Sequence, residues 1–327
     1  MWMPTESGSL IPAAELADRV RAAGARRIVL QLPDGLKRRA PALVRALGAE
    51  GIEVAAVAGD PCYGACDLAL DTVALTGADL LVHIGHAPVE EREGVLYEYL
   101  SFDFDPAAVA AALPLLNGTE VGLVTTVQHV HLLKEVTEVL ATHGIRAEVG
   151  PGDGRTPLPG QVLGCSYANA RALSAPEILY VGTGVFHAIG VALATGKHVV
   201  ALDPYSGEVR EVSGDADRLL RRRFALIEKA RSAECVGIIL STKSGQARPA
   251  LAARLAALSE KAVVITMREV SAAEMVNFGC GAYVNTACPR LAYDDQVRFP
   301  VPLLTPQEFE VLVGVRAWEE YEVDEIV

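Results

Sequence analysis

Ile28-Val-Leu-Gln-Leu-Pro-Asp-Gly-Leu36 is the stretch that decides the fold class of this sequence. Its first five residues form an apolar run of strand length, and the polar turn that follows leads into an amphipathic helix. The helix is predicted from one stripe of apolar residues at helical spacing: Leu36, Ala40, Leu43, Val44 and Leu47. A second apolar run follows at residues 52–57. This order of strand, helix and strand predicts a parallel βαβ unit with a right-handed crossover.

The same pattern recurs twice, which indicates an internal repeat. Val121-Gly-Leu-Val-Thr125 and Val236-Gly-Ile-Ile-Leu240 are apolar runs of the same length, and each precedes a stripe of apolar residues. The stripes are Leu133, Val136 and Leu140 in the second copy, and Leu251, Leu255 and Leu258 in the third. Further strands are expected at residues 79–84, 145–149, 178–181, 198–202, 263–267 and 282–286.

The repeat predicts an α/β fold of three small domains, at residues 1–115, 116–213 and 214–327. Continuous apolar strands are typical of parallel sheets that are covered on both faces. In such sheets ligands bind beyond the carboxyl ends of the strands. Three related domains can turn those ends towards one another, so we expect one shared central site.

The composition excludes several classes of function. The chain has 41 acidic and 29 basic residues, and its net charge of −12 argues against nucleic acid as a partner. The only basic cluster, Arg221-Arg222-Arg223, is predicted to be the solvated side of a helix. Residues 1–20 contain no apolar segment of the signal-peptide kind. The uncharged run at residues 178–196 holds four glycines and is predicted to be strand, loop and helix, so we expect a cytoplasmic protein with no membrane association.

Six cysteines require an explanation. Structural disulfides are not expected in a reducing compartment. Cys235 and Cys280 stand beside apolar strands and are predicted to be small buried hydrophobic residues. The other four lie in loops rich in glycine, proline and polar residues, where chemistry is usually found.

Three of the loop cysteines, Cys66, Cys165 and Cys288, fall one in each repeat, on the carboxyl side of a strand. Three thiolates from three domains suit a 4Fe–4S cluster with one iron open to substrate. Zinc bound by Cys62 and Cys66 would need a second close pair of ligands, and Cys280 is too far from Cys288 to provide it. A single loop with three cluster cysteines is not present, because no third cysteine follows Cys66 closely. Spacing alone leaves the cluster and a set of incidental cysteines both open.

Longer motifs favour the cluster. The sequence resembles the archaeal diphthamide synthase family, the 2-(3-amino-3-carboxypropyl)histidine synthases, over almost its whole length. The motifs that carry the resemblance are Gln31-Leu-Pro-Asp-Gly-Leu36, Tyr63-Gly-Ala-Cys-Asp67, His83-Ile-Gly-His86, Gln128-His-Val-His131, Pro159-Gly-Gln-Val-Leu-Gly-Cys165, Gly182-Thr-Gly-Val-Phe-His187, Asp203-Pro-Tyr205, Ala287-Cys-Pro-Arg290 and Glu319-Glu-Tyr-Glu-Val-Asp-Glu325.

The resemblance implies a function. It implies a 4Fe–4S cluster held by Cys66, Cys165 and Cys288, with Cys62 as a bystander near the site. It implies that S-adenosylmethionine donates its 3-amino-3-carboxypropyl group to carbon C2 of one histidine of elongation factor 2, by a radical mechanism. Methylthioadenosine would be released. The resemblance also implies a homodimer and an external electron donor.

The residues that hold S-adenosylmethionine are less directly indicated. Its carboxylate would suit backbone N–H groups at a helix start, and Gly182, Thr183 and Gly184 lead from a strand into a helix. Further candidates are polar residues at or just beyond strand ends, of which we select Gln128, Lys243 and Gln246; His129 and Arg290 are similar. His83, His86 and His187 lie in comparable loops and are expected to be structural histidines.

Three other functions remain open at this stage. Quinolinate synthase is also a three-unit α/β protein with one cluster cysteine in each unit, although its motifs differ. The chain would alternatively be a non-catalytic electron-relay subunit of a heterodimer. A ligand-binding α/β protein with incidental cysteines is the third alternative. Release of methylthioadenosine separates the synthase from quinolinate synthase. Modification of the factor by the purified chain without a homologous partner would exclude the relay, and anaerobic purification of an iron-free protein would favour the last.

Overall fold

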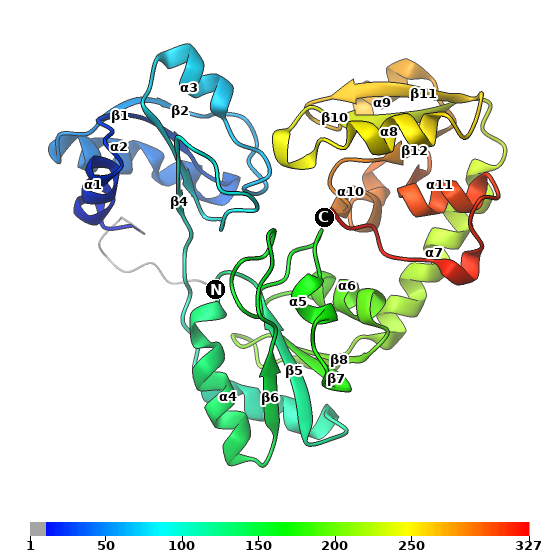
Figure 1. Ribbon diagram of the computed structural model, residues 1–327, viewed down its shortest axis with the longest axis horizontal. Helices are drawn as coiled ribbons and strands as arrows, with labels where there is room; N and C mark the ends of the chain where they lie inside the picture. Colours follow the sequence, from blue (N-terminus) through cyan, green and yellow to red (C-terminus); the bar gives the residue numbers. More distant parts are fainter. Residues whose placement is uncertain (1–10, 327) are drawn as a thin grey trace. The chain divides into compact units, whose positions relative to one another are not determined.

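The computed structural model describes residues 11–326, in which the strands form three sheets, each flanked by helices (Figure 1). Contacts divide the chain into two compact units, the first ending at Leu100 and the second beginning at Ser101. The first sheet belongs to the first unit, and the other two sheets belong to the second. The α/β class is therefore confirmed, whereas the boundaries of three separate domains remain a prediction.

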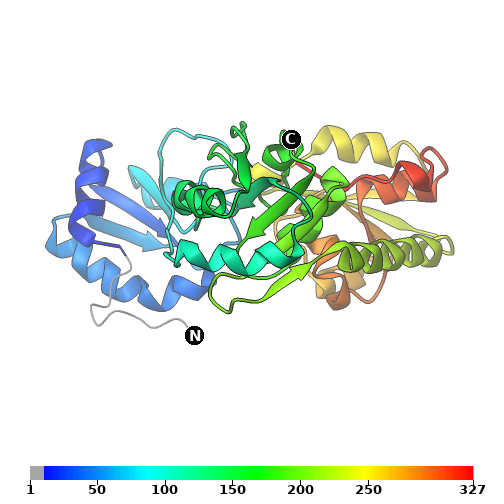
Figure 2. The ribbon, with the colours of Figure 1, turned by 90° about the horizontal axis from the view of Figure 1, so that it is seen from below.

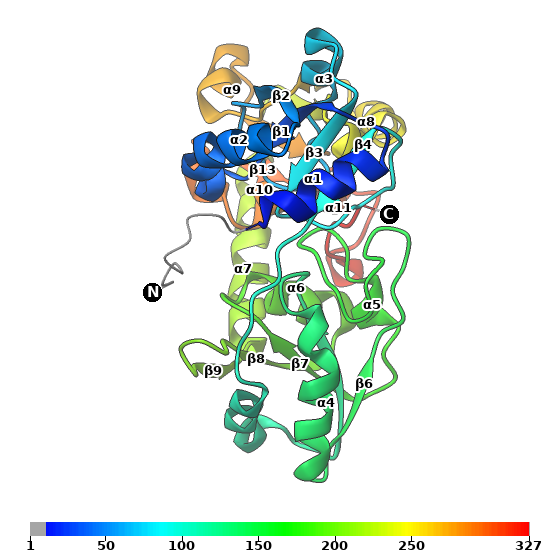
Figure 3. The same cartoon turned by 90° about the vertical axis from the view of Figure 1, so that its left-hand side faces the viewer.

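The first sheet has the order β2-β1-β3-β4, and all its strands are parallel. Its strands are β1 (Arg27–Gln31), β2 (Glu53–Val57), β3 (Leu80–Ile84) and β4 (Val95–Glu98). Its helices are α1 (Ala13–Ala22), η1 (Asp34–Arg39), α2 (Ala40–Ala49) and α3 (Leu70–Thr76). Helices α1 and α2 pack together over one face of the sheet (Figure 3) and share one apolar core with it. The segment that leads into α3 packs against the opposite face, so the strands are covered on both sides, as predicted.

The second sheet has the order β6-β5-β7-β8-β9, and only β9 is antiparallel to its neighbour. Its strands are β5 (Glu120–Thr125), β6 (Arg146–Val149), β7 (Glu177–Val181), β8 (His198–Leu202) and β9 (Val209–Glu211). Its helices are η2 (Pro106–Leu115), η3 (Val130–Leu132), α4 (Leu133–Thr142), α5 (Ala168–Arg171) and α6 (Phe186–Thr195). The long helix α7 (Ser213–Ala230) packs against α6 and leads to the third sheet (Figure 2).

The third sheet repeats the order of the first, as β11-β10-β12-β13. Its strands are β10 (Val236–Ser241), β11 (Ala262–Met267), β12 (Ala282–Asn285) and β13 (Leu303–Leu304). Its helices are η4 (Ser244–Gln246), α8 (Pro249–Ala256), α9 (Ala272–Phe278), α10 (Arg290–Tyr293), η5 (Gln296–Arg298), α11 (Pro306–Leu312) and η6 (Trp318–Glu320). No helix within residues 11–326 combines the length and apolar character needed to cross a membrane.

The predicted helical stripes form the cores of the sheets. Leu43 and Leu47 of α2 are buried against the first sheet, and Val136 and Leu140 of α4 are buried against the second. Leu255 of α8 is buried against the third. Each fully buried leucine contributes about 1.5–3 kcal/mol relative to an exposed one, so the spacing that predicted the helices also supplies their stabilisation.

The strand order reverses at the same place in every sheet, between its first and third strands. In flavodoxin-like sheets the crevice beyond this switch point is where ligands bind. In the first sheet, Gln31 at the end of β1 pairs in register with His83 of β3. The switch point therefore marks the carboxyl edge of each sheet as the expected position of a ligand site.

Glu177, at the start of β7, fixes the opposite edge of the second sheet. Its carboxylate accepts hydrogen bonds from the backbone N–H groups of Asn117 (2.9 Å) and Gly118 (2.8 Å) and contacts His198 Nδ1 at 3.0 Å. Burial raises the pKa of Glu177, but these donors outweigh burial and lower it below its ordinary value. The carboxylate thus ties the η2–β5 turn to two adjacent strands.

One predicted surface feature is wrong. Arg221 and Arg222 are exposed, but Arg223 of the same basic cluster is fully buried. Its Nε donates to Glu308 Oε1 at 2.7 Å, and its other nitrogens donate to the carbonyl groups of Ala292 and Leu303. Successive helical residues point about 100° apart, so one arginine of the three turns to the inner face of α7, where Glu308 neutralises it.

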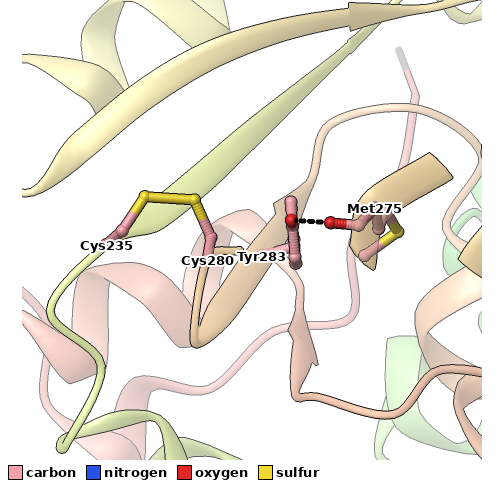
Figure 4. Close-up of a disulfide and its surroundings, with 4 residues drawn as sticks. All are labelled: Cys235, Met275, Cys280 and Tyr283. Carbon is pink, nitrogen blue, oxygen red and sulfur yellow. Dashed lines mark hydrogen bonds between the residues drawn. A yellow bond between two sulfur atoms is a disulfide. The ribbon is translucent and has the colours of Figure 1, made fainter. Parts of the chain in front are cut away.

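The prediction for Cys235 and Cys280 is also wrong in one respect, because the two residues form a disulfide (Figure 4). They precede β10 and β12, which are adjacent strands, and their Cα atoms are 4.7 Å apart. Cys280 is buried, as expected. Nearby, the Tyr283 hydroxyl donates to the Met275 carbonyl, and both side chains belong to the same apolar core. Sheet pairing of two distant segments, which the sequence spacing does not display, creates this contact.

Candidate functional site

Cys66 lies half-buried in the loop that follows β2, as predicted. The side chain of Gln31 organises this loop from the end of β1: its Nε2 donates to the Asp67 carbonyl at 2.7 Å. Its Oε1 accepts a hydrogen bond from the backbone N–H of Ala69 at 3.2 Å. Within the loop, Gly64 leaves little free space, because a Cβ there would lie 3.3 Å from Cys66 Sγ. Gln31 thus fixes the part of the loop that follows Cys66, and the Cys66 thiol stays partly accessible.

A second group of side chains lies in the same unit and was not predicted. One ligand atom from each of Cys62, His83 and His86 lies within 4.8 Å of the other two. His83 Nδ1 is 2.9 Å from Gln31 Oε1, and His83 Nε2 is 3.1 Å from His86 Nδ1. The sequence signal for this group was the position of Gln31 and His83 at the ends of two strands that flank the switch point.

Burial sets the protonation of this group. It raises the pKa of the Cys62 thiol to about 12, although the Gly64 backbone N–H acts in the opposite sense. Burial lowers the pKa of His83 to about 3, with a contribution from the neighbouring His86. It also lowers the pKa of His86 to about 4. At neutral pH the group therefore consists of a thiol and two neutral imidazoles.

Cys165 lies in the long loop between β6 and α5, close to a short bridge between Leu163 and Ser166. The C-terminal segment fastens this loop. The Ile326 N–H donates to the Cys165 carbonyl at 2.8 Å, and the Glu325 carboxylate accepts from the Tyr167 N–H at 2.7 Å. The acidic segment at residues 319–325 therefore supports a cysteine loop.

Cys288 follows β12 and is held by a turn of its own. Asn285 Nδ2 donates to the Cys288 carbonyl at 2.7 Å, and Asn285 Oδ1 accepts from the Ala287 N–H at 3.0 Å. Arg248 adds hydrogen bonds to the carbonyl groups of Thr286 and Ala287, and it also forms a buried ion pair with Asp324 at 2.7 Å. The same C-terminal segment thus supports both cysteine loops of the second unit.

Tyr167 brings Cys165 and Cys288 into one neighbourhood. Its ring is fully buried, and burial raises the pKa of its hydroxyl well above the ordinary value. Both thiols lie close enough to add to this shift. Gly190 of α6 makes room for the ring, because a Cβ at that position would overlap the Tyr167 hydroxyl. Two of the three predicted ligands therefore lie near the same tyrosine of the second unit.

The glycine loop before α6 borders a cavity of about 780 Å³ in the second unit. Thr183 and Gly184 line it together with Arg222 and Arg290. Gly184 has φ of +70°, a conformation that glycine adopts without strain, and α6 begins two residues later. Asp294 also lines the cavity and pairs with Arg290 at 2.8 Å, so the cavity holds charges of both signs. The backbone N–H groups at the start of α6 would suit an anion. Gly182 precedes this turn, and its N–H donates to the Leu202 carbonyl at 2.9 Å.

The other predicted cofactor residues lie at strand ends, as expected. Gln128 is half-buried beyond β5, and its carbonyl accepts from the Phe102 N–H at 2.9 Å. Lys243 and Gln246 are both buried in the loop beyond β10. Lys243 forms an ion pair with Glu269 at 2.7 Å. These positions leave their assignment to the cofactor as a prediction.

The donor set fits an iron–sulfur cluster. Cys66, Cys165 and Cys288 are all partly accessible, and each lies in a loop beyond the carboxyl end of a parallel strand. Thiolates are the usual ligands of such clusters. The fold and these loops together define a three-sheet α/β protein with cysteines in loops beyond its strand ends.

Comparison with known proteins identifies the family. The family described as "Putative diphthamide synthesis protein" matches residues 32–322, so this chain belongs to it. The chain is 39% identical over 326 residues to the 2-(3-amino-3-carboxypropyl)histidine synthase of Pyrococcus horikoshii, covering 97% of this chain and 94% of the relative. It is 32% identical over 315 residues to subunit 1 of the same synthase from Gallus gallus, covering 92% and 76%.

A solved structure confirms the fold. The crystal structure of Dph2 from Pyrococcus horikoshii with a 4Fe–4S cluster matches with a TM-score of 0.89 and 37% identity, covering 97% of this chain and 94% of that chain. A second crystal structure of the same protein matches with a TM-score of 0.90. The family resemblance and the α/β class expected from the sequence are thereby confirmed, and the chain belongs to a family of enzymes.

Proposed function

We propose that this chain is a 2-(3-amino-3-carboxypropyl)histidine synthase that transfers the 3-amino-3-carboxypropyl group of S-adenosylmethionine to carbon C2 of a histidine of elongation factor 2. The observation that carries the proposal is the position of the three cysteines in loops beyond parallel strands, two of them beside one buried tyrosine. The relatives named for this synthase cover nearly the whole chain. The proposal includes a homodimer, a cytoplasmic location and an external electron donor.

Cys66, Cys165 and Cys288 would hold a 4Fe–4S cluster with one iron free of protein ligands. Bound there and reduced, such a cluster would supply the electron needed to break the bond from the sulfonium sulfur to the γ-carbon of the methionine part. A radical at that carbon suits the acceptor, because C2 of neutral imidazole is a poor nucleophile in polar alkylation. The protein's part is to orient the cofactor, since orientation decides which of the sulfonium bonds is broken.

The polar loops of the second unit supply candidate contacts for that orientation. Gly182, Thr183 and Gly184 lie at the start of α6, where backbone N–H groups and the helix dipole favour a carboxylate. Lys243 and Gln246 beyond β10, and Gln128 beyond β5, are the further candidates for the polar groups of the cofactor. The buried ring of Tyr167 would exclude water behind two of the cluster ligands.

Iron and nucleoside analyses test the proposal together. The anaerobically purified chain is expected to contain about four irons, and Cys66→Ala, Cys165→Ala and Cys288→Ala should each lose most of that iron and the activity. Cys62→Ala should keep the cluster and serves as the matched control. Iron retained in all three variants, or lost only with Cys62→Ala, would contradict the ligand assignment.

The second measurement concerns the bond that is broken. With dithionite and S-adenosylmethionine but no protein acceptor, the reduced enzyme should release methylthioadenosine and a four-carbon aminobutyrate-type product. With elongation factor 2 present, the chain alone, without any homologous partner subunit, should attach the 3-amino-3-carboxypropyl group to the histidine. A main product of 5′-deoxyadenosine would refute the orientation argument and the synthase assignment with it.

A further inference from the structure

The cluster of Cys62, His83 and His86 lies at the carboxyl end of the first sheet. All three side chains come from the first unit, on two segments far apart in sequence. Cys62 is in the loop after β2, and the two histidines belong to β3 and the turn that follows it. Among residues 11–326 this is the group of histidine, cysteine and acidic side chains whose ligand atoms lie close enough to share one metal ion.

The position of the histidine pair is fixed by a glycine. Gly85, between the two histidines, has φ of +101°, and its N–H donates to the Glu98 carbonyl at 2.7 Å. A Cβ on this glycine would lie 3.0 Å from Pro33. The turn therefore requires glycine, and it returns His86 to within hydrogen-bond distance of His83.

The hydrogen bonds of Gln31 determine which nitrogen of His83 carries the proton. Gln31 Nε2 donates to the Asp67 carbonyl, so its Oε1 faces His83 Nδ1 as an acceptor. A neutral imidazole that donates from Nδ1 has its lone pair on Nε2, the atom that faces His86 Nδ1. Bound metals commonly use such an arrangement, in which a second group orients the ligating histidine.

The donor set selects the kind of ion. One thiol and two neutral imidazoles offer sulfur and nitrogen and no oxygen, which excludes calcium and magnesium as natural occupants. Zinc takes thiolate at about 2.3 Å and imidazole at about 2.0–2.1 Å in a tetrahedral arrangement. The His83–His86 nitrogen distance of 3.1 Å is close to the edge of such a tetrahedron, about 3.3 Å. The two histidine nitrogens therefore need little movement to bind one zinc ion, and the Cys62 thiol lies within 4.8 Å of a ring nitrogen of each histidine.

We propose that Cys62, His83 and His86 form a mononuclear zinc site in the first unit, separate from the cysteines that would hold the iron–sulfur cluster. Binding replaces the proton of the Cys62 thiol, which leaves to solvent, and moves the proton of His86 from Nδ1 to Nε2. Three protein ligands leave a fourth position for water. Zinc would clamp the start of the Cys66 loop to β3, while Gln31 holds the end of that loop. This role for the loop rests on the proposed function of Cys66, but the metal site does not.

A pair of crossed variants tests the site on the full chain. After anaerobic purification from medium with iron and zinc, the native chain should contain about one zinc in addition to its iron. Cys62→Ser and His86→Gln should each lower the zinc content at least tenfold and keep the iron. Cys66→Ala should lose iron and keep zinc, and His143→Gln, which changes an exposed histidine, should alter neither. Zinc absent from the native chain, or retained in Cys62→Ser and His86→Gln, overturns the proposal; iron retained in Cys66→Ala contradicts only the cluster assignment.

Cobalt provides a second readout that does not depend on iron. A chain with Cys66, Cys165, Cys235, Cys280 and Cys288 all replaced by alanine keeps Cys62 as its only cysteine. Titration with Co²⁺ should produce a thiolate-to-cobalt charge-transfer band and the visible bands of four-coordinate cobalt at one equivalent, and zinc should abolish both. Far-ultraviolet circular dichroism checks that this variant is folded. A folded protein without the charge-transfer band would mean that the histidines form a hydrogen-bonded pair with no metal, and it would refute the proposal.

Discussion

Replacing Arg223 by methionine should destabilise the second unit severely, although the residue belongs to a basic cluster that looks solvated in the sequence. Arg223 is 1% exposed and Glu308 is 0% exposed. Methionine has a similar length and fills the same space without charge. The variant therefore isolates the loss of the ion pair from the loss of packing.

The expected magnitude follows from the groups that are left behind. Removing one partner of a buried ion pair typically costs 3–5 kcal/mol, because the other charge stays buried without compensation. The carbonyl groups of Ala292 and Leu303 also lose their donor, at about 1 kcal/mol each. These costs overlap, so we expect a loss of about 4 kcal/mol in the free energy of unfolding. Folded domains are typically more stable than their unfolded state by about 5–15 kcal/mol, so the variant should be only marginally folded.

Urea denaturation followed by tryptophan fluorescence measures this loss. Trp318 packs against Phe224 and Tyr321 in the second unit, and a Trp2→Phe background makes it the only tryptophan. Arg222→Met is the matched control, because the neighbouring arginine is exposed and should change stability by less than about 0.5 kcal/mol.

The double variant Arg223→Met, Glu308→Gln completes the argument. It should recover at least about 1 kcal/mol, because glutamine removes the charge and still accepts the capping hydrogen bond from Thr305. If Arg223→Met and Arg222→Met had equal effects, or if the double variant were less stable than Arg223→Met, the account of a buried, compensated ion pair would be refuted.

Three further predictions concern other parts of the second unit. Glu177→Gln should lower the free energy of unfolding by about 1 kcal/mol at pH 7. Folding lowers the pKa of the Glu177 carboxyl, so the advantage of the native residue should shrink as the pH falls below the ordinary pKa of 4.5. Denaturation curves that show a constant difference between pH 3 and 7 would contradict this. Reducing the Cys235–Cys280 disulfide should cost about 4 kcal/mol for its 45-residue separation, measured by melting with and without reductant; the double Cys→Ser variant should be unaffected by reductant. Gly190→Ala should cost about 1–3 kcal/mol through overlap with the tyrosine ring, whereas Gly214→Ala, with open space around it, should be neutral or stabilising in the same melting assay.

Much of the fold was predictable because its determinants are local in sequence. Strand-length apolar runs and helical stripes gave β1, β5 and β10 to within a residue or two, and the stripes became the cores. The internal repeat predicted three sheets, and the repeated strand order follows from it. The grouping of the second and third sheets in one unit depends on contacts of α7 and the C-terminal segment, which no local pattern displays.

The residues that sequence reasoning misjudged share a different cause. Arg223, Cys235 and Cys280 each acquire their partner through pairing between distant segments. A run of three arginines looks like a charged surface, and two isolated cysteines look like apolar residues, until the sheet places a carboxylate or a second sulfur beside them. Buried charges require partners, so the error becomes visible only when the partner is known.

The candidate sites show the same division between local and distant information. Cys66, Cys165 and Cys288 could be selected from sequence because a thiol in a polar loop after a strand is a local signal. Cys62 and Cys66 have no second close pair of cysteines that would complete a zinc site. In the proposed zinc site the second pair is His83 and His86, which lie at and just after the end of β3, close to Cys62 in the loop after β2. In a parallel sheet, the carboxyl ends of strands that are distant in sequence lie at the same edge, so metal ligands can come from several strand ends as well as from one loop.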